Sequence, residues 1–310
     1  MNLQIAASAM IASTALILYT GTVCADEQKV SGRTSMFNEQ WLDTIVSIEQ
    51  LRPQLNPDGS VVQSSDGKIV QAPMPIGTGF IVKTANKHLV LITAKHVVAT
   101  SETPSKSEKP NLVYRINQQE GPAYLQYDKQ LEQNGLGNWF LSTTADVACR
   151  FLAWEINSKF RAISPDKFMP RTMLQAGADL LILGFPMGLR SEENPSPIIR
   201  KGMVARSDKT ELLADAFVFP GNSGGPALYR PPIKVKGDSL TSPFINEERL
   251  VGLVSSFLPY FDTAVSQQTK RPRIVFEENS GLARIVPADA IIELLSRDDV
   301  TKLDSIIKSN

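Results

Sequence analysis

Gly221-Asn222-Ser223-Gly224-Gly225-Pro226 is the stretch that decides how this 310-residue chain folds. Glycine adopts backbone angles that side chains forbid, so glycines on both sides of a serine let the chain turn sharply around it. Such a turn can direct two N–H groups, here those of Gly221 and Ser223, at an oxyanion. The stretch therefore predicts a serine nucleophile with its oxyanion hole, although a turn of this composition can also be purely structural.

The positions of the two histidines separate two classes of fold for this serine. A nucleophilic serine needs a base, and His88 and His96 both precede Ser223. The stretch also satisfies the G-x-S-x-G pattern of α/β-hydrolases, in which the histidine follows the serine. No histidine follows Ser223, so the order of residues excludes that fold.

His96 is the predicted base. It follows the apolar run 89–94, which is typical of a buried strand that ends beside it. His88 belongs to the polar run 85–88, which predicts an exposed hairpin turn. A histidine at the end of a buried strand is held in place, and one in an exposed turn is not.

Asp146 is predicted to orient that base. A buried carboxylate that accepts the ring N–H holds an imidazole in one tautomer. Asp146 opens the apolar run 147–149 and lies between His96 and Ser223 in the sequence. An Asp at the start of a strand can also merely cap a turn, and the same interval contains other candidates, namely Asp128, Asp166, Asp179, Asp208 and Asp215.

The pattern of apolar residues predicts a β-rich fold. Runs of four to eight apolar residues are separated by Gly, Pro, Asn or Asp about every ten residues. We expect a helix from 287, a linker at 155–172 and surface insertions at 52–75, 188–197 and 230–248. The expected strands are 44–49, 79–83, 89–93, 111–116, 147–153, 180–184, 202–206, 216–219, 227–229 and 251–255.

Composition limits the partners and the cofactors. Thirty-two basic residues balance thirty-two acidic ones, so no overall charge recruits nucleic acid. Residues 1–25 carry no charged side chain and contain apolar runs at 10–12 and 15–19. They resemble a signal peptide with cleavage after Ala25, with an uncleaved anchor as the alternative. Removal of this segment would leave Cys149, in a predicted strand, as the one cysteine. Two histidines and two cysteines are too few for a zinc site of soft ligands, and we expect no metal.

Four blocks, in this order, resemble the trypsin-like serine peptidases, in particular the bacterial HtrA/Deg proteases. They are Gly-Thr-Gly-Phe-Ile-Val at 77–82, Thr-Ala-Lys-His-Val-Val at 93–98, Asp-Val-Ala at 146–148 and the stretch around Ser223. The resemblance implies an all-β fold of two packed six-stranded antiparallel β-barrels, chymotrypsin-like, with a C-terminal helix. The expected barrels are 37–160, which supplies His96 and Asp146, and 171–286, which supplies Ser223, and the helix occupies 287–310.

The resemblance implies a serine endopeptidase that forms an acyl-enzyme and needs no cofactor. The N-terminal segment 1–25 indicates that it is secreted or periplasmic. Its partner would be a peptide or protein substrate, in a cleft lined by Phe217, Ser255 and Phe257. The alternative is a catalytically silent member of the same fold that binds peptides or proteins; an esterase is a third reading.

Three departures from the family pattern refine this expectation. Animal enzymes of the family place Asp before the serine to receive a newly cut N-terminus, whereas this chain has Asn222, so we expect no such activation. Phe217, six residues before Ser223, indicates small or apolar rather than basic substrate side chains. The 59 residues after Val251 are too few for the PDZ domain usual in HtrA proteins, so we expect none.

Overall fold

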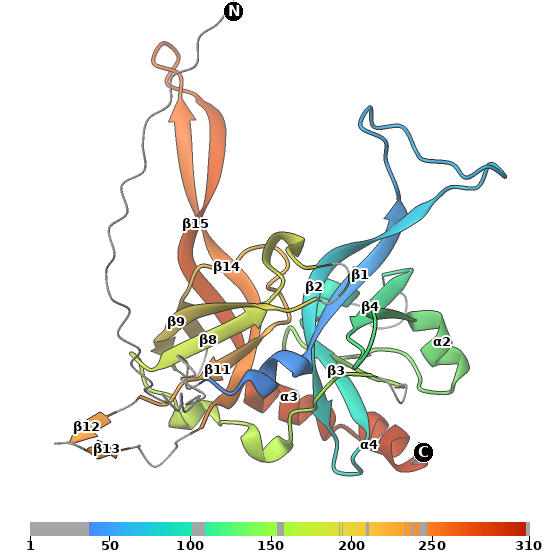
Figure 1. Cartoon of the computed structure of the whole chain (residues 1–310). Coiled ribbons are helices and arrows are strands. Elements are labelled where there is room, and N and C mark those ends of the chain that lie inside the picture. Colours follow the sequence, from blue (N-terminus) through green and yellow to red (C-terminus); the bar gives the residue numbers. More distant parts are fainter. Residues whose placement is uncertain are drawn as a thin grey trace, which may run out of the picture. The chain divides into compact units, whose positions relative to one another are not determined.

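The computed structural model places most of the chain in one compact unit that begins at Phe37 (Figure 1). The predicted signal peptide lies outside the described residues, as do parts of the predicted linker 155–172 and insertion 230–248. No helix in the described part of the chain is long and apolar enough to cross a membrane. The structure describes residues 37–100, 109–153, 158–191, 193, 195–208, 211–232, 234–236, 239–241 and 247–307.

The first half of the unit is a seven-stranded antiparallel sheet in the order β5-β4-β1-β2-β3-β7-β6. Two short helices interrupt it, α1 (Lys95–Val98) after β3 and α2 (Asp128–Gln133) after β5. A 3-10 helix, η1 (Glu39–Thr44), leads into β1. The strands are β1 (Ile45–Pro53), β2 (Gln71–Lys83), β3 (Leu89–Thr93), β4 (Leu112–Ile116), β5 (Tyr124–Tyr127), β6 (Phe140–Leu141) and β7 (Ala148–Phe151).

The second half is a closed six-stranded antiparallel barrel in the order β10-β15-β14-β11-β8-β9. Its strands are β8 (Asp179–Gly184), β9 (Ile198–Ser207), β10 (Leu212–Asp215), β11 (Pro226–Tyr229), β14 (Arg249–Val265) and β15 (Pro272–Pro287). Short 3-10 helices η2 (Pro165–Lys167) and η3 (Arg171–Met173) precede β8, and η4 (Pro186–Gly188) follows it. A separate pair, β12 (Lys234–Lys236) and β13 (Ser239–Thr241), lies in the predicted insertion 230–248.

The predicted chymotrypsin-like, all-β architecture is confirmed, except that the first half is a seven-stranded sheet and not a closed six-stranded barrel. The predicted C-terminal helix is present as two short helices, α3 (Ala288–Leu295) and α4 (Asp298–Ile306). The exact limits of the two predicted barrels stay a prediction.

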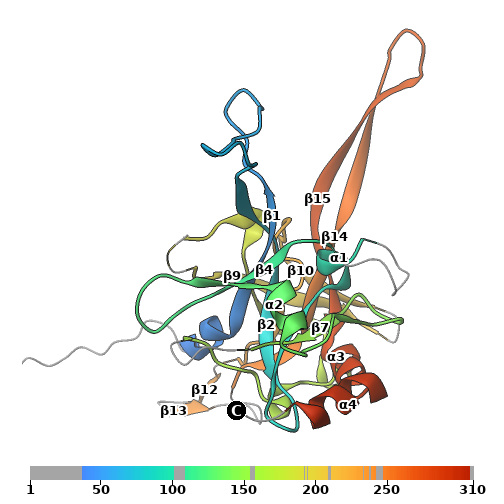
Figure 2. The ribbon, with the colours of Figure 1, turned by 90° about the vertical axis from the view of Figure 1, so that its right-hand side faces the viewer.

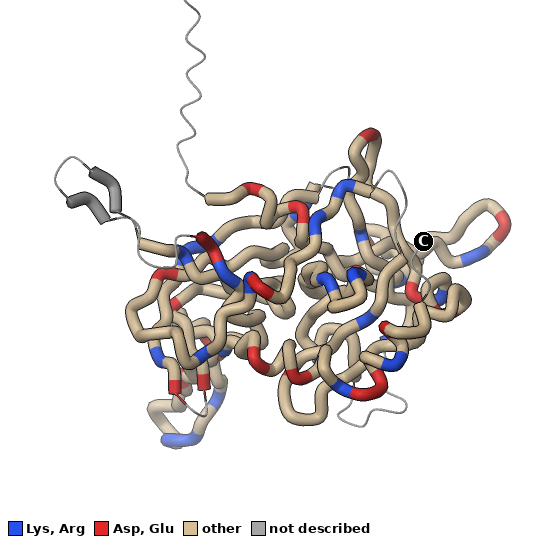
Figure 3. Tube along the Cα trace, turned by 90° about the horizontal axis from the view of Figure 1, so that it is seen from below, with Lys and Arg blue, Asp and Glu red and all other residues tan. Residues whose placement is uncertain are grey.

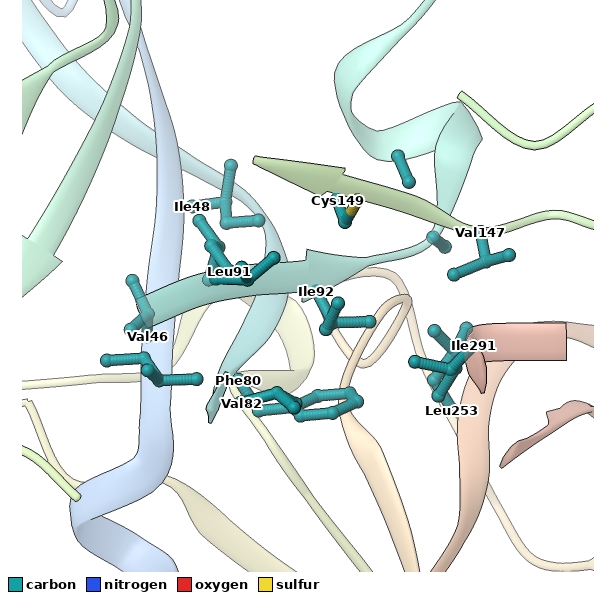
Figure 4. Close-up of a cluster of buried hydrophobic side chains, with 14 of the residues drawn as sticks. Val46, Ile48, Phe80, Val82, Leu91, Ile92, Val147, Cys149, Leu253 and Ile291 are labelled. Carbon is teal, nitrogen blue, oxygen red and sulfur yellow. The ribbon is translucent and has the colours of Figure 1, made fainter. Parts of the chain in front are cut away.

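One hydrophobic core runs from the first sheet into the second barrel and α3. Ile92 of β3, Val147, Leu253 of β14 and Ile291 of α3 are all buried in it, side by side in Figure 4. Each fully buried side chain of this size contributes about 1.5–3 kcal/mol. The shared core therefore fixes the first sheet, which carries His96 and Asp146, against the barrel that carries Ser223. A second cluster fills the barrel itself and includes Ile182 and Val251.

The strand predicted at 216–219 is wrong. Ala216 and Val218 are buried in the barrel core, which explains their apolar character, but this segment does not join a strand ladder. Ala216 N donates to Gly281 O (2.8 Å), and Val218 O accepts from the side chain of Asn279 (2.7 Å). The barrel strand in this region is β10, which ends at Asp215.

The prediction that His88 is exposed is also wrong, because the C-terminal helix covers its turn. Nδ1 of His88 lies 2.8 Å from Oδ1 of Asp304 on α4, and the histidine side chain is only 14% exposed. The same carboxylate accepts from Thr84 Oγ1 (2.7 Å) and Asn86 Nδ2 (3.0 Å). His88 therefore helps to anchor α4 and is not available as a base for Ser223.

Candidate active site

Asp146 and His96 form a hydrogen-bonded pair in the first sheet. Asp146 Oδ2 lies 2.8 Å from Nδ1 of His96, and Oδ1 accepts the backbone N–H of His96 at 3.0 Å. His96 stands in α1, directly after β3, and Asp146 precedes β7, which pairs with β3. The two contacts fix both the position and the ring orientation of His96, with Nδ1 assigned as the protonated nitrogen from this geometry. The imidazole is half-exposed.

Ser255 of β14 connects this pair to Ser223. Its hydroxyl donates to Asp146 Oδ2 at 2.6 Å, and its carbonyl accepts from Ser223 Oγ at 3.1 Å. Ser223 Oγ thus donates to Ser255 O, and no hydrogen bond joins it to His96 among the described residues. Catalytic hydrogen bonds are often long or absent without substrate. Ser255 was predicted only as a cleft residue, and nothing in the sequence indicates its contact with Asp146.

The carboxyl group of Asp146 is held ionised. Burial alone raises its pKa, but the hydrogen bond and the charge of His96, together with the bond from Ser255, outweigh burial and lower the pKa to about 2. A carboxylate that stays charged across the neutral range stabilises an imidazolium at His96. This is the electrostatic condition for His96 to accept a proton.

The residues before Ser223 form a tight turn. Asn222 N donates to Phe219 O at 2.9 Å, and Gly221 has a φ of +98°. Pro followed by Gly at the two central positions is typical of a type II turn. A Cβ on Gly221 would lie 2.2 Å from Phe185 O, so no other residue fits there.

The two predicted oxyanion donors are free to bind a ligand. Among the described residues, no acceptor takes the N–H of Gly221 or of Ser223. The N–H of Gly221 and the carbonyl of Pro220 belong to one peptide group. Met187 N donates to Pro220 O at 2.6 Å and so holds this group in place. Met187 has a φ of +56°, which is unfavourable for a residue with a side chain. The position of Met187 therefore sets the direction of one oxyanion donor.

Thr78 of β2 ties the turn to the first sheet. Its hydroxyl donates to Gly221 O (2.6 Å) and accepts from Phe185 N (3.0 Å). Its N–H donates to Ser223 O (2.9 Å), and its carbonyl accepts from Thr93 Oγ1 (2.7 Å). Thr78 is completely buried, so each of these bonds is protected from water. One threonine thus joins both sides of the interface behind Ser223.

Asn222 supports the turn from within. Its side chain is completely buried, and Oδ1 accepts from Phe219 N at 3.0 Å. The side chain is a neutral amide, so its burial leaves no charge to be compensated by a cation. Nδ2 of Asn222 has no hydrogen-bond partner among the described residues.

A buried ion cluster anchors the loop that follows Met187. Arg190 and Arg115 both contact the carboxylate of Glu49 on β1, with Nε–Oε1 distances of 2.8 Å in each case. Glu49 is completely buried. Removal of one partner from such a cluster leaves an uncompensated buried charge. The predicted insertion 188–197 is therefore fixed at its start to the first sheet.

Two further predicted cleft residues, Phe217 and Phe257, belong to the second barrel. The ring of Phe217 packs over Gly281, where a Cβ would lie 3.4 Å from it, and the side chain is 53% exposed. Phe257, two residues after Ser255, is half-buried against the barrel core. An exposed phenyl ring provides an apolar surface and no charge.

Four of the five competing aspartates are engaged elsewhere. Asp128 pairs with Arg150 and accepts from Tyr114, and burial raises the pKa of its carboxyl group. Asp166, Asp179 and Asp208 pair with Lys167, Lys201 and Arg206. No group of three metal-ligating side chains occurs in the described ranges, and Cys149 is buried, which raises the pKa of its thiol.

The sequence of the central part of the chain matches a known family. Residues 77–230 match the model of the trypsin-like peptidase domain. These residues belong to the trypsin-like peptidase family. No curated protein matches the chain.

The chain is also similar in fold to solved structures at low identity. One is titled HtrA-type protease AlgW with decapeptide, at 12% identity and a TM-score of 0.46; the match covers 83% of this chain and 65% of that one. Another is titled HtrA-type protease AlgW with tripeptide, at 12% identity and a TM-score of 0.43, covering 82% and 60%. This chain spans less than two thirds of those chains.

Asp146→Asn should remove a pH-dependent part of the stability. The pKa of Asp146 is lowered in the folded state, so its contribution is present above the unfolded pKa and lost as the pH falls from about 4 to about 2. We expect the variant to be less stable at pH 6 by about 2 kcal/mol and equal to the parent near pH 2. Urea unfolding over this range measures the difference; a difference that does not change with pH contradicts the assignment.

Thr78→Val should loosen the turn before Ser223. The change keeps the shape but leaves Gly221 O and Phe185 N buried without the hydroxyl, at a cost of roughly 1–3 kcal/mol in the free energy of unfolding. Thr78→Ser keeps the hydroxyl and serves as the control. Urea unfolding compares the two; equal stability of Val and Ser variants would show that the hydroxyl does not hold the turn.

Proposed function

We propose that this protein is a serine endopeptidase, with Ser223 as nucleophile, His96 as base and Asp146 as the carboxylate that orients it. One observation carries the proposal. A single carboxylate binds the ring nitrogen of His96 and the hydroxyl of Ser255, and the carbonyl of Ser255 contacts Ser223 Oγ. The proposal includes export from the cytoplasm, which rests on the uncharged segment 1–25 and its apolar runs.

The reaction begins when Ser223 Oγ attacks the carbonyl carbon of a peptide bond. His96 Nε2 accepts the hydroxyl proton, and the charged Asp146 stabilises the resulting imidazolium. The N–H groups of Gly221 and Ser223 stabilise the oxyanion, each by roughly 3 kcal/mol of activation free energy. His96 then gives its proton to the leaving amine, and a water molecule, deprotonated by His96, hydrolyses the acyl-enzyme.

The proposed substrate preference follows from Phe217. In the proposed cleft its exposed ring, packed over Gly281, offers apolar contact to the side chain before the scissile bond. A cationic side chain would lose its hydration there without meeting a carboxylate at position 217. We therefore propose cleavage after small or apolar residues.

Covalent labelling tests the proposed nucleophile. A biotinylated phosphonate of an apolar amino acid should modify Ser223 in the parent protein and leave Ser223→Ala unmodified, as detected by mass spectrometry.

The outcome also separates the proposal from a silent member of the same fold. In such a protein Ser223 would remain on the carbonyl of Ser255, and the phosphonate would leave the parent unmodified at every pH. Ser256→Ala is a suitable control, because it changes a neighbouring serine with no assigned role in the reaction.

A further inference from the structure

A small cavity lies between η1, residues 161–167 and the start of β14. Its volume is about 170 Å³, and Trp41, Ile163 and Glu248 are among the residues that line it. An apolar cavity of about 150 Å³ holds a benzene molecule, so this one admits a group of about six non-hydrogen atoms or slightly more. Figures 1 and 2 show η1 (blue) at the lower end of β1, and in Figure 2 α1, which carries His96, lies on the other side of the unit. The cavity is therefore separate from the proposed active site.

Glu248 places a buried carboxylate at this cavity. The residue is only 7% exposed, and its one hydrogen bond within the described part of the chain comes from Asn38 N, at 3.4 Å. The neighbouring cations bind Glu247 instead: Lys167 Nζ lies 2.5 Å from Glu247 Oε2, and Arg249 Nη2 lies 3.0 Å from Glu247 Oε1. Buried charges in proteins are normally paired. The carboxylate of Glu248 is thus available to a cation that enters the cavity.

The indole of Trp41 gives the cavity an aromatic wall. Trp41 is a buried residue of η1, and the buried side chain of Ile163 adds apolar surface. A planar guanidinium can bind a carboxylate through two parallel hydrogen bonds and also stack on an aromatic ring, and it is more weakly hydrated than an ammonium. Among aromatic side chains, tryptophan attracts cations most strongly. A carboxylate and an indole in one cavity therefore favour a guanidinium over an ammonium group.

We propose that this cavity is a binding site for a guanidinium group on a short apolar stem. Glu248 binds the guanidinium, Trp41 contacts its flat face, and Ile163 contacts the methylene groups of the stem. The guanidinium belongs either to a free small molecule or to an arginine side chain of a polypeptide, two sources that share this chemistry. The inference goes beyond the proposed function and does not depend on it, because none of these residues takes part in the proposed reaction.

Arg161 is the competing cation at this site. It lines the same cavity, and its backbone N–H donates to Asp43 O at 2.8 Å. Its side chain is exposed and makes no ion pair within the described ranges. The charge of Arg161 repels a bound guanidinium, and its side chain would lose conformational freedom by pairing with Glu248. Arg161→Gln should therefore tighten the binding, by about twofold or more.

Indole N–H signals of the ¹⁵N-labelled protein measure the binding. The chain has three tryptophans, and Trp41→Phe identifies the signal of Trp41. Titration with n-propylguanidinium should shift this signal saturably. A neutral molecule of the same shape, n-propylurea, should bind at least about tenfold more weakly. Absence of a saturable shift, or equal affinity for the urea, overturns the inference.

Two variants test whether Glu248 is the group that binds the cation. Glu248→Gln keeps the size of the side chain but removes its charge, and it should weaken the binding of n-propylguanidinium at least about tenfold. Glu278→Gln changes an exposed glutamate of β15 and should leave the dissociation constant unchanged. Equal affinity of Glu248→Gln and the parent overturns the site. The comparison with n-propylurea uses the parent protein, so it decides the question even if Glu248→Gln fails to fold.

Two larger ligands identify the source of the guanidinium. Tighter binding of agmatine than of N-acetyl-L-arginine amide supports a free small molecule, and the reverse order supports an arginine of a polypeptide. Failure of both to shift the Trp41 signal overturns the site. Such a failure leaves the phosphonate labelling of Ser223 unaffected, so the binding site and the peptidase are tested separately.

Discussion

Close contact between the turn around Ser223 and β2 is the constraint on which the site depends. A Cβ on Gly224 would lie 2.2 Å from Thr78 O, and one on Gly225 would lie 2.2 Å from Leu183 O. Gly224 is thus required because the backbone of the second barrel approaches the first sheet without room for a side chain, and Gly225 is required because the turn packs closely against β8 within the barrel. Thr78 uses this proximity to hold Gly221 and Ser223 together.

The groups of the proposed site also lie at this interface, apart from the mixed charges along the rest of the chain. The chain has balanced charges, and Figure 3 shows Lys and Arg interspersed with Asp and Glu along the trace. The groups that carry the proposed chemistry are instead partly withdrawn from water at the junction of the two halves. Asp146 is kept ionised by two donors from different halves, His96 and Ser255. The same two bonds hold the base near the barrel that carries Ser223.

The sequence predicted those parts of the fold and site that depend on local patterns. Runs such as 89–93 have the length and burial of a strand, and His96 at its end was predicted from that context. Contacts between distant segments were missed, since no local pattern records them. Ser255 beside Asp146, Asp304 over His88, and Glu49 between Arg115 and Arg190 join residues far apart in the chain. The extension of β14 and β15 beyond the barrel was not predicted, because Asp262, Glu277 and Glu278 interrupt its apolar alternation.

The central claim is that Ser223, activated by His96 and Asp146, forms an acyl-enzyme. Its most direct test is the burst of p-nitrophenol released from an apolar amino-acid p-nitrophenyl ester, with mass spectrometry of the acid-quenched protein. The account predicts a burst that approaches one equivalent per chain, with the acyl group on Ser223, and no burst from Ser223→Ala. Steady release without a burst and without an acyl group on Ser223 would contradict it.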